Sequence, residues 1–154
     1  DYEAHKSEFL SNYESAMTVH TRAFAGVQVM LGCLIDAQLP WGIVTNKAER
    51  FTLPLVRTMG VLQGAAAVVS GDTTPHAKPH PAPLLEAARR LQVHPATCIY
   101  VGDDERDIVA GKAAGMLTVA ARYGYLGSHA DTLSWGADYL IDEPVQLLKL
   151  LELA

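Results

Sequence analysis

The chain has 154 residues, of which 49% are hydrophobic and 19% are charged, and its formal net charge is −5. These values predict one packed globular domain and exclude a disordered chain. No basic run is present, which argues against nucleic acid as a partner, and the longest apolar runs are too short to cross a membrane. Cys33 and Cys98 stand far apart in apolar segments, so we expect buried, reduced thiols and a cytoplasmic protein.

Hydrophobic periodicity predicts helices and strands that alternate along the chain. A polar helix is expected over residues 1–19 and a connector over 18–26. Further helices are expected at 27–39, 48–59, 84–91 (with a start near Pro81), 105–114 and 144–153. Strands are expected at 41–44, 65–70, 97–101, 116–120 and 139–141. Pro54 predicts a kink or a late start in its helix. The loops are 71–83 and 122–135, the second with a possible helical turn at 131–135. This alternation is typical of an α/β fold, a doubly wound parallel sheet with helices on both faces.

The stretch 99–108 combines an apolar run, a glycine and four acids within five positions. A strand that ends here would direct Asp103 and Asp104 into the crevice at the carboxyl edge of a parallel sheet, with Asp107 one helical turn further on. Carboxylates crowded in this way suit a divalent cation such as Mg²⁺. They also suit simple capping of a helix start, and the cluster alone does not decide between the two interpretations.

Two further segments could contribute to the same crevice. Thr45 and Asn46 follow a strand and open a helix, where free backbone amides favour phosphate, although Thr45 could equally be a helix cap. Lys78 stands in a proline-rich segment that holds it in an extended conformation before a helix, so that its ammonium could neutralise a phosphate. The alternative is a solvated surface lysine. His76 and His80 are interpreted as loop residues.

These three segments, in this order and spacing, resemble the haloacid dehalogenase superfamily of phosphohydrolases, and especially its phosphoglycolate phosphatase-like group. The resemblance rests on residues 41–47, 78–81, 101–111 and 114–115, with 122–125 and 135–138 in support. It implies a HAD-like Rossmannoid core, a phosphatase activity and Mg²⁺ as the cofactor. Segment 122–125 lies at a strand end and could contact the substrate or only pack its loop.

The resemblance also implies a role for each matching residue. Thr45 would bind the substrate phosphoryl group through its hydroxyl, with the Asn46 amide beside it. Lys78 would orient the nucleophile and offset phosphate charge. Asp103 would be a side-chain ligand of Mg²⁺. Asp107, with Asp104, would assist at the metal or hold Lys78 from a second layer of contacts.

One departure from the family pattern concerns the nucleophile. The family has a first strand that ends in Asp-x-Asp-x-Thr, whose first aspartate forms an aspartyl-phosphate; this sequence contains no such motif. We therefore expect residues 1–18 to be the tail of a helical cap and 19–154 a core without its first strand. Either a longer phosphatase supplies the missing segment, which we favour, or the chain is a catalytically inactive module. A protein that begins at Asp1 should show no phosphatase activity.

The leading functional hypothesis is a Mg²⁺-dependent hydrolase of a small phosphorylated metabolite, most simply 2-phosphoglycolate. The alternative within this class is N-acetylmuramic acid 6-phosphate. From another class, a non-catalytic binding module would keep the sheet and the metal site. A signalling receiver domain fits less well, because its acidic pair comes before the threonine and lysine rather than after them. We expect a monomer or a homodimer.

Overall fold

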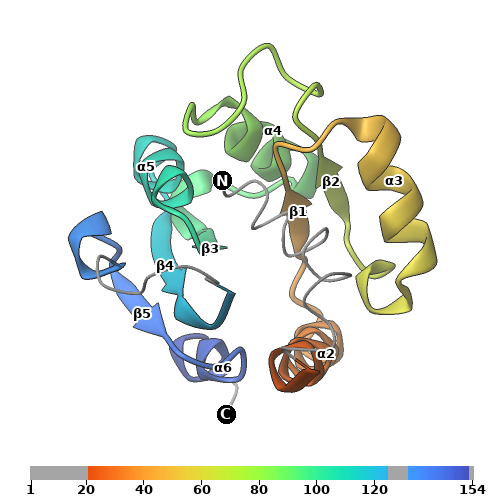
Figure 1. Cartoon of the computed structure of the whole chain (residues 1–154), viewed down its shortest axis with the longest axis vertical. Coiled ribbons are helices and arrows are strands. Elements are labelled where there is room, and N and C mark those ends of the chain that lie inside the picture. The colour runs from red at the N-terminus through yellow and green to blue at the C-terminus, as the bar shows by residue number, and fades with distance from the viewer. Residues whose placement is uncertain (1–20, 125–131, 153–154) are drawn as a thin grey trace.

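The computed structural model describes residues 21–124 and 132–152. Helices and strands alternate along the described chain (Figure 1). The helices are α2 (Thr21–Asp36), α3 (Glu49–Thr58), α4 (Ala82–Leu91), α5 (Glu105–Ala113) and α6 (Gln146–Leu150). The strands are β1 (Gly42–Val44), β2 (Ala67–Val69), β3 (Ile99–Gly102), β4 (Leu117–Ala121) and β5 (Tyr139–Ile141). Short 3₁₀ turns are η1 (Gly60–Leu62), η2 (Pro95–Thr97), η3 (Arg122–Gly124) and η4 (Thr132–Trp135).

The described strands form two parallel sheets. β1 pairs with β2, and β3, β4 and β5 pair in that order. Across the molecule the strands follow the order β2, β1, β3, β4, β5 (Figure 1). The carboxyl ends of β1 and β3 lie close to each other, because the Lys78 ammonium contacts both the Val44 carbonyl oxygen and the Tyr100 hydroxyl. Between β1 and β3 the described residues form no ladder.

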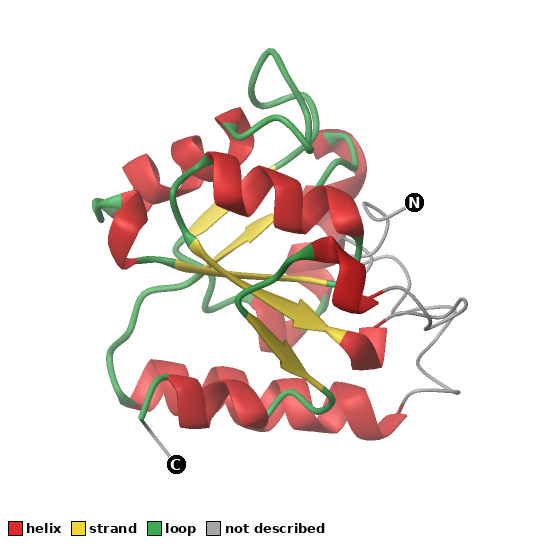
Figure 2. Cartoon of the chain, turned by 90° about the vertical axis from the view of Figure 1, so that its left-hand side faces the viewer, coloured by secondary structure: helices red, strands yellow, loops and turns green. Residues whose placement is uncertain are grey.

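Helices cover both faces of the strands, as the sequence predicts (Figure 2). On one face, α2 and α6 enclose a buried apolar cluster that includes Val27, Leu34 and Ile43. On the other face, α4 and α5 enclose a second cluster that includes Leu84. In β1, Ile43 belongs to the first cluster and Val44 to the second. Their side chains point to opposite faces because successive residues of a strand alternate between faces.

Several boundaries differ from the predicted ones. The connector expected at 18–26 is helical from Thr21 onward, since alanines at 23 and 25 favour a helix. Gly26 does not mark a loop: it lets α2 approach Pro144, whose Cγ would lie 3.1 Å from an added Cβ. The late start expected from Pro54 does not occur, because α3 begins at Glu49. Residues 1–18 lie outside the described chain.

The last helix is shorter than the predicted 144–153. Leu147 and Leu148 donate their amides to the carbonyls three residues earlier, those of Pro144 and Val145, so the chain makes a 3₁₀-like turn before α6 begins. The two cysteines are free thiols, as expected, but both are half-buried rather than fully buried. Burial raises the pKa of the Cys98 thiol.

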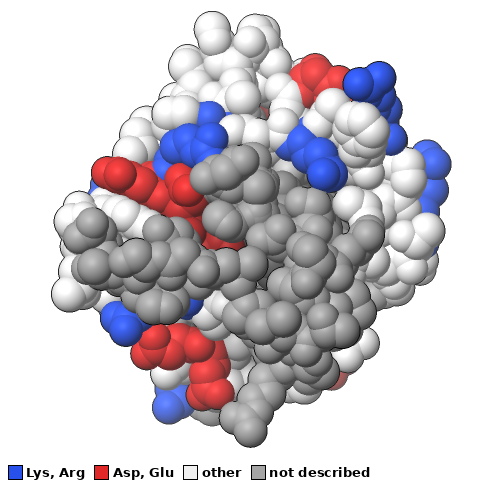
Figure 3. Space-filling view, viewed as in Figure 1, with Lys and Arg blue, Asp and Glu red and all other residues white. Residues whose placement is uncertain are grey.

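The molecular surface carries charges of both signs. On the face seen in Figure 3, lysine and arginine side chains lie in small groups among aspartates and glutamates. Within the described residues, no helix is long and apolar enough to span a membrane.

Candidate active site

Lys78 is the centre of a buried polar cluster at the carboxyl ends of β1 and β3. Its ammonium donates hydrogen bonds to the Val44 carbonyl oxygen at 3.1 Å, to the Tyr100 hydroxyl at 2.9 Å and to Asp107 Oδ1 at 2.9 Å. The side chains of Lys78 and Asp107 are both fully buried. The interpretation of Lys78 as a solvated surface residue is therefore wrong, because the proline-rich segment directs its side chain into the protein.

Asp107 connects this lysine to the turn that follows β3. Its second carboxylate oxygen, Oδ2, accepts hydrogen bonds from the amides of Asp103 at 3.1 Å and Asp104 at 3.3 Å. Gly102 is what allows this turn, because a Cβ at that position would overlap the Asp107 carboxyl group. Asp107 thus holds Lys78 with one oxygen and the turn with the other. Of the two roles considered for Asp107, these contacts favour the one in which it holds the lysine.

Asp104 caps helix α5. Its Oδ1 accepts a hydrogen bond from the Arg106 amide at 2.9 Å and forms an ion pair with the Arg106 guanidinium at 3.2 Å. Partial burial raises the pKa of Asp104, but the hydrogen bonds from the Arg106 amide and guanidinium outweigh it, and the pKa lies below its usual value. The capping interpretation is confirmed for Asp104. Its part in binding Mg²⁺ stays a prediction.

Thr45 and Asn46 lie directly beyond β1, beside the lysine. Thr45 is fully buried, and its hydroxyl oxygen accepts a hydrogen bond from the Lys47 amide at 3.0 Å. The Asn46 side chain binds the main chain of Lys78 twice: Oδ1 accepts from its amide at 2.9 Å, and Nδ2 donates to its carbonyl at 3.0 Å. The loop after β2 packs closely against Asn46 at Gly71, since a Cβ at that position would overlap the Asn46 carbonyl.

Asp103 is the best candidate for a metal ligand among the described residues. It is 3% exposed and follows β3 directly, so its carboxylate belongs to the same edge of the strands as Thr45 and Lys78. Carboxylate oxygens are the ligands that Mg²⁺ prefers. Within the described chain, however, no three His, Cys, Asp or Glu side chains gather closely enough to hold a metal ion. Asp103 can therefore supply one ligand to Mg²⁺, and the described residues do not supply the rest of the coordination shell.

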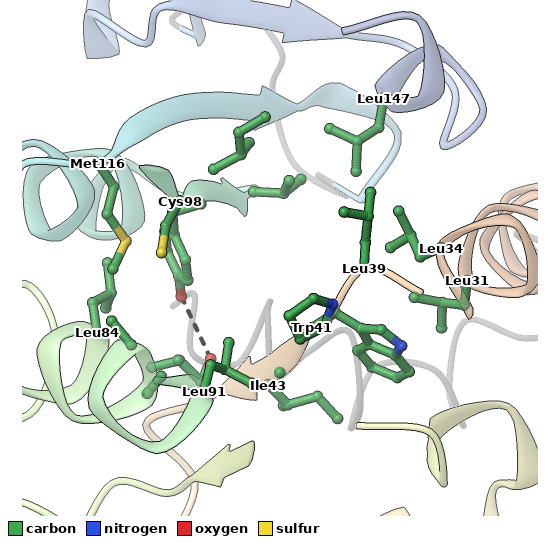
Figure 4. A pocket seen from close by; sticks show the side chains of 18 of the residues that line it. Leu31, Leu34, Leu39, Trp41, Ile43, Leu84, Leu91, Cys98, Met116 and Leu147 are labelled. Atoms are coloured by element: carbon green, nitrogen blue, oxygen red, sulfur yellow. Dashed lines mark hydrogen bonds between the residues drawn. The ribbon is translucent and has the colours of Figure 1, made fainter. Parts of the chain in front are cut away.

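An apolar cavity of about 410 Å³ lies between β1 and β3. Side chains from α2, α4 and α6 converge on it, including Leu31, Leu91 and Leu147 (Figure 4). Ile43 and Val101, from β1 and β3, also line it. We name this cavity the inter-strand slot.

The slot is bordered by main-chain edges that face away from their own sheets. Thr45 donates its amide to Val69 in β2, so alternation along β1 turns the Val44 carbonyl toward β3, where Lys78 binds it. Likewise, Leu117 donates to the Cys98 carbonyl, so the main chain of Ile99 is turned toward β1. Polar main-chain edges and apolar side chains therefore both border the slot.

The predicted site residues therefore come together, with one addition. Thr45 and Asn46 follow β1, and Asp103 follows β3. Lys78 lies in the loop between β2 and α4 and Asp107 in the first turn of α5, and their side chains meet beside the strand ends. Tyr100 belongs to the apolar run of the predicted strand, yet its hydroxyl contacts Lys78. A phenol in an otherwise aliphatic run, two positions before the glycine, is the signal that could have drawn attention to it.

Two other predicted features lie further out. Arg122 pairs with Asp142 at 3.0 Å on the surface, and residue 125 is outside the described chain, so contact of this segment with a substrate stays a prediction. His76 and His80 stack on each other with ring centroids 4.3 Å apart. The His80 ring also accepts a hydrogen bond from the Ala82 amide, which is consistent with a loop role.

Comparison with known proteins identifies a family and several similar proteins. The model of the haloacid dehalogenase-like hydrolases matches residues 1–121. A phosphoglycolate phosphatase of Xanthomonas campestris pv. campestris is 48% identical over 145 residues, covering 94% of this chain and 66% of that protein. An N-acetylmuramic acid 6-phosphate phosphatase of Pseudomonas putida is 38% identical over 153 residues, covering 99% of this chain and 69% of that protein. The chain thus spans about two thirds of these relatives.

Solved structures share the fold. A predicted phosphoglycolate phosphatase from Haemophilus somnus 129pt superposes with a TM-score of 0.71 at 27% identity, covering 79% of this chain and 54% of that one. A β-phosphoglucomutase from Clostridium difficile superposes with a TM-score of 0.69 at 22% identity, covering 83% and 54%. With the family model matched over most of its length, this chain belongs to the haloacid dehalogenase-like hydrolases.

Proposed function

We propose that this chain forms the greater part of a Mg²⁺-dependent phosphomonoester hydrolase that acts on a small metabolite. The observation that carries the proposal is the buried Lys78–Asp107 pair beside Thr45 and Asp103. Burying two charges is costly, so a fully buried ion pair at a sheet edge favours a chemical role over a purely stabilising one. A fixed cation beside a hydroxyl and a carboxylate suits a transferring phosphoryl group.

The names of the relatives supply the first substrates to test. A phosphoglycolate phosphatase is the more similar of the two described above, at 48% identity. We therefore propose 2-phosphoglycolate as the substrate and N-acetylmuramic acid 6-phosphate as the alternative, after the relative at 38% identity. A location in the cytoplasm and a monomeric or homodimeric state remain predictions.

The nucleophile is proposed to come from a strand that occupies the inter-strand slot. The outward-facing main-chain edges of β1 and β3 support this, because a parallel strand placed between them would join the two sheets. Its carboxyl end would lie beside Lys78 and Asp103. In this hypothesis residues 19–154 form the core around that strand, and residues 1–18 belong to a cap domain.

Each residue of the site has a proposed task. An aspartate of the inserted strand attacks phosphorus, the ester P–O bond breaks, and a second acid of that strand gives the leaving oxygen its proton. Water then hydrolyses the aspartyl-phosphate to inorganic phosphate. Thr45 donates its hydroxyl to a phosphoryl oxygen, and Lys78 offsets the negative charge. Mg²⁺, held in part by Asp103, would add electrostatic stabilisation of the phosphoryl group.

The experiment compares two proteins for release of inorganic phosphate. One is the 154-residue chain; the other is the same chain extended at Asp1 with the leading segment of the Xanthomonas campestris relative. Both receive 2-phosphoglycolate or N-acetylmuramic acid 6-phosphate, with MgCl₂ or with EDTA. Phosphate release that needs both the extension and Mg²⁺ is the expected result, and the preferred substrate identifies the activity.

The other outcomes are equally informative. Release by the 154-residue chain alone would refute the proposed origin of the nucleophile. Failure of both proteins to release phosphate, with Mg²⁺ and phosphate still bound, would favour the non-catalytic binding module. An extended protein in which Lys78→Met leaves the rate unchanged would show that the site described above does not perform the reaction.

A further inference from the structure

Lys78 carries its charge at the end of a flexible side chain, yet it lies in a defined position. The three oxygens around its ammonium come from three elements: Val44 from β1, Tyr100 from β3 and Asp107 from α5. A lysine ammonium has three N–H donors, so each of these oxygens can accept one hydrogen bond from it. Asp107 supplies the opposite charge, whereas Val44 and Tyr100 supply neutral oxygens that fix direction.

The Tyr100 hydroxyl lies within reach of both other partners. It is 3.3 Å from Asp107 Oδ1 and 3.5 Å from the Val44 carbonyl oxygen. Because a phenol has one proton and two lone pairs, it can accept from Lys78 while it donates to one of these oxygens. Lys78, Tyr100 and Asp107 therefore form a closed triangle of hydrogen-bonding groups, in which displacing one group disturbs the other two.

The Tyr100 ring itself is held by the protein core. It packs against the buried cluster between the sheet and helices α4 and α5. Helix α5 packs directly against it, since a Cβ at Gly111 would lie 3.6 Å from two atoms of the Tyr100 side chain, an ordinary van der Waals distance. The Lys78 ammonium also lies 5.5 Å from the ring centroid, a distance suited to a cation–π contact.

Packing alone would not require the hydroxyl. A phenylalanine would fill the same apolar space, and a strand position facing α4 and α5 suits one well. The hydroxyl instead reaches the one buried ammonium described here, among oxygens that form the proposed active site. We propose that Tyr100 is a positioning residue, whose hydroxyl orients the Lys78 ammonium. Its consequence for catalysis rests on the proposed phosphatase function, but the positioning itself does not.

The test uses the conservative substitution Tyr100→Phe, with Tyr139→Phe as its control. Tyr139 is an exposed residue of β5, away from the Lys78 cluster. In ¹⁵N-labelled protein, the Lys78 ammonium is observed by proton–nitrogen correlation and assigned by its loss in Lys78→Arg. We expect its protons to exchange with water about tenfold faster in Tyr100→Phe and at the original rate in Tyr139→Phe.

A measurement on the unmodified protein keeps the proposal falsifiable even where a variant folds poorly. Nuclear Overhauser contacts between the Lys78 ammonium and the Tyr100 ring protons are expected, and their absence would overturn the proposal. Unchanged ammonium exchange in a folded Tyr100→Phe variant would overturn it too. Neither measurement depends on phosphatase activity, so both remain valid if the proposed function fails.

In the extended, active protein, a second effect is expected. Tyr100→Phe should lower kcat about tenfold and leave KM nearly unchanged, because a misplaced ammonium affects the transferring phosphoryl group more than substrate binding. A rise in KM with unchanged kcat would contradict the positioning role.

Discussion

The Lys78 ammonium lies 2.9 Å from Asp107 Oδ1, and neither side chain is exposed to solvent. Removing one partner of such a pair leaves a buried charge without its counter-charge. We therefore expect Asp107→Asn to lower the free energy of unfolding by about 3–5 kcal/mol, as is typical of broken buried pairs. Urea unfolding followed by circular dichroism measures the change.

The matched control is the double variant Lys78→Met with Asp107→Leu, which removes both charges and keeps apolar volume. It should be more stable than the single variants Lys78→Met and Asp107→Leu, because no unpaired charge remains buried. A double variant whose loss equals the sum of the two single losses would show that the charges do not interact. Both single variants and the double variant should lack phosphatase activity in the extended protein.

Gly102 provides a second test of the turn after β3. Gly102→Ala places a Cβ on the Asp107 carboxyl group, so the turn or the ion pair must move. We expect a loss of about 1–3 kcal/mol in the free energy of unfolding, typical of overpacking, and a loss of activity. The control is Gly32→Ala in α2, where an added Cβ meets no atom within 4 Å.

The control should change stability in the opposite direction. Alanine replaces glycine within a helix, so Gly32→Ala should raise the free energy of unfolding by about 0.5–1 kcal/mol. Thermal unfolding of the two variants side by side measures both effects. Equal stability of Gly102→Ala and the unmodified protein would mean that the turn has room that the structure does not show.

Much of the fold is predictable because its signals are local. Strand β5 matches its predicted bounds, and α4 begins next to Pro81, a residue suited to a helix start. The connector predicted to end at Gly26 is wrong because this glycine allows close packing of α2 against Pro144. Such a tertiary contact leaves no local pattern in the sequence. The late start expected from Pro54 does not occur, because α3 contains this exposed proline in its interior.

The site is predictable in its residue types but not in its contacts. Thr45, Lys78 and Asp103 stand out because each follows a strand or lies in a rigid loop. The burial of Lys78 depends on partners 34, 22 and 29 residues away, and sequence spacing cannot identify such pairs without a fold. The same is true of Asn46, whose side chain binds a main chain 32 residues away.

The two Asn46 hydrogen bonds lead to a prediction about the Lys78 loop. Asn46→Ala removes both bonds to the main chain of Lys78. With each bond worth about 1 kcal/mol, the Lys78 amide should exchange with deuterium roughly 30-fold faster. Hydrogen-exchange mass spectrometry of the peptide that contains Lys78 measures this. Asn46→Asp keeps the acceptor oxygen and loses the donor, so its effect should be smaller. Equal exchange rates in the unmodified protein and both variants would show that the two Asn46 hydrogen bonds do not hold the Lys78 main chain.

Asp138 supplies a prediction of pH dependence. Its Oδ2 accepts hydrogen bonds from the Thr118 amide at 2.8 Å and from the Thr118 hydroxyl at 3.0 Å, and these bonds lower the pKa of Asp138. A lowered folded-state pKa stabilises the protein above the ordinary pKa, and this stabilisation is lost as the pH falls through the folded-state value. Asp138→Asn should therefore be less stable than the unmodified protein at pH 7.

The difference in stability between the unmodified protein and Asp138→Asn should shrink below about pH 4. In that range Asp138 takes up a proton, first in the unfolded and then in the folded unmodified protein. Urea unfolding midpoints of both proteins between pH 7 and about pH 3 measure it. Thr118→Val is the control, because it removes the hydroxyl and keeps the amide, so it should reproduce only part of the loss at pH 7. A stability difference that stays constant over this range would mean that the carboxylate charge has no part in holding β4 to the segment before β5.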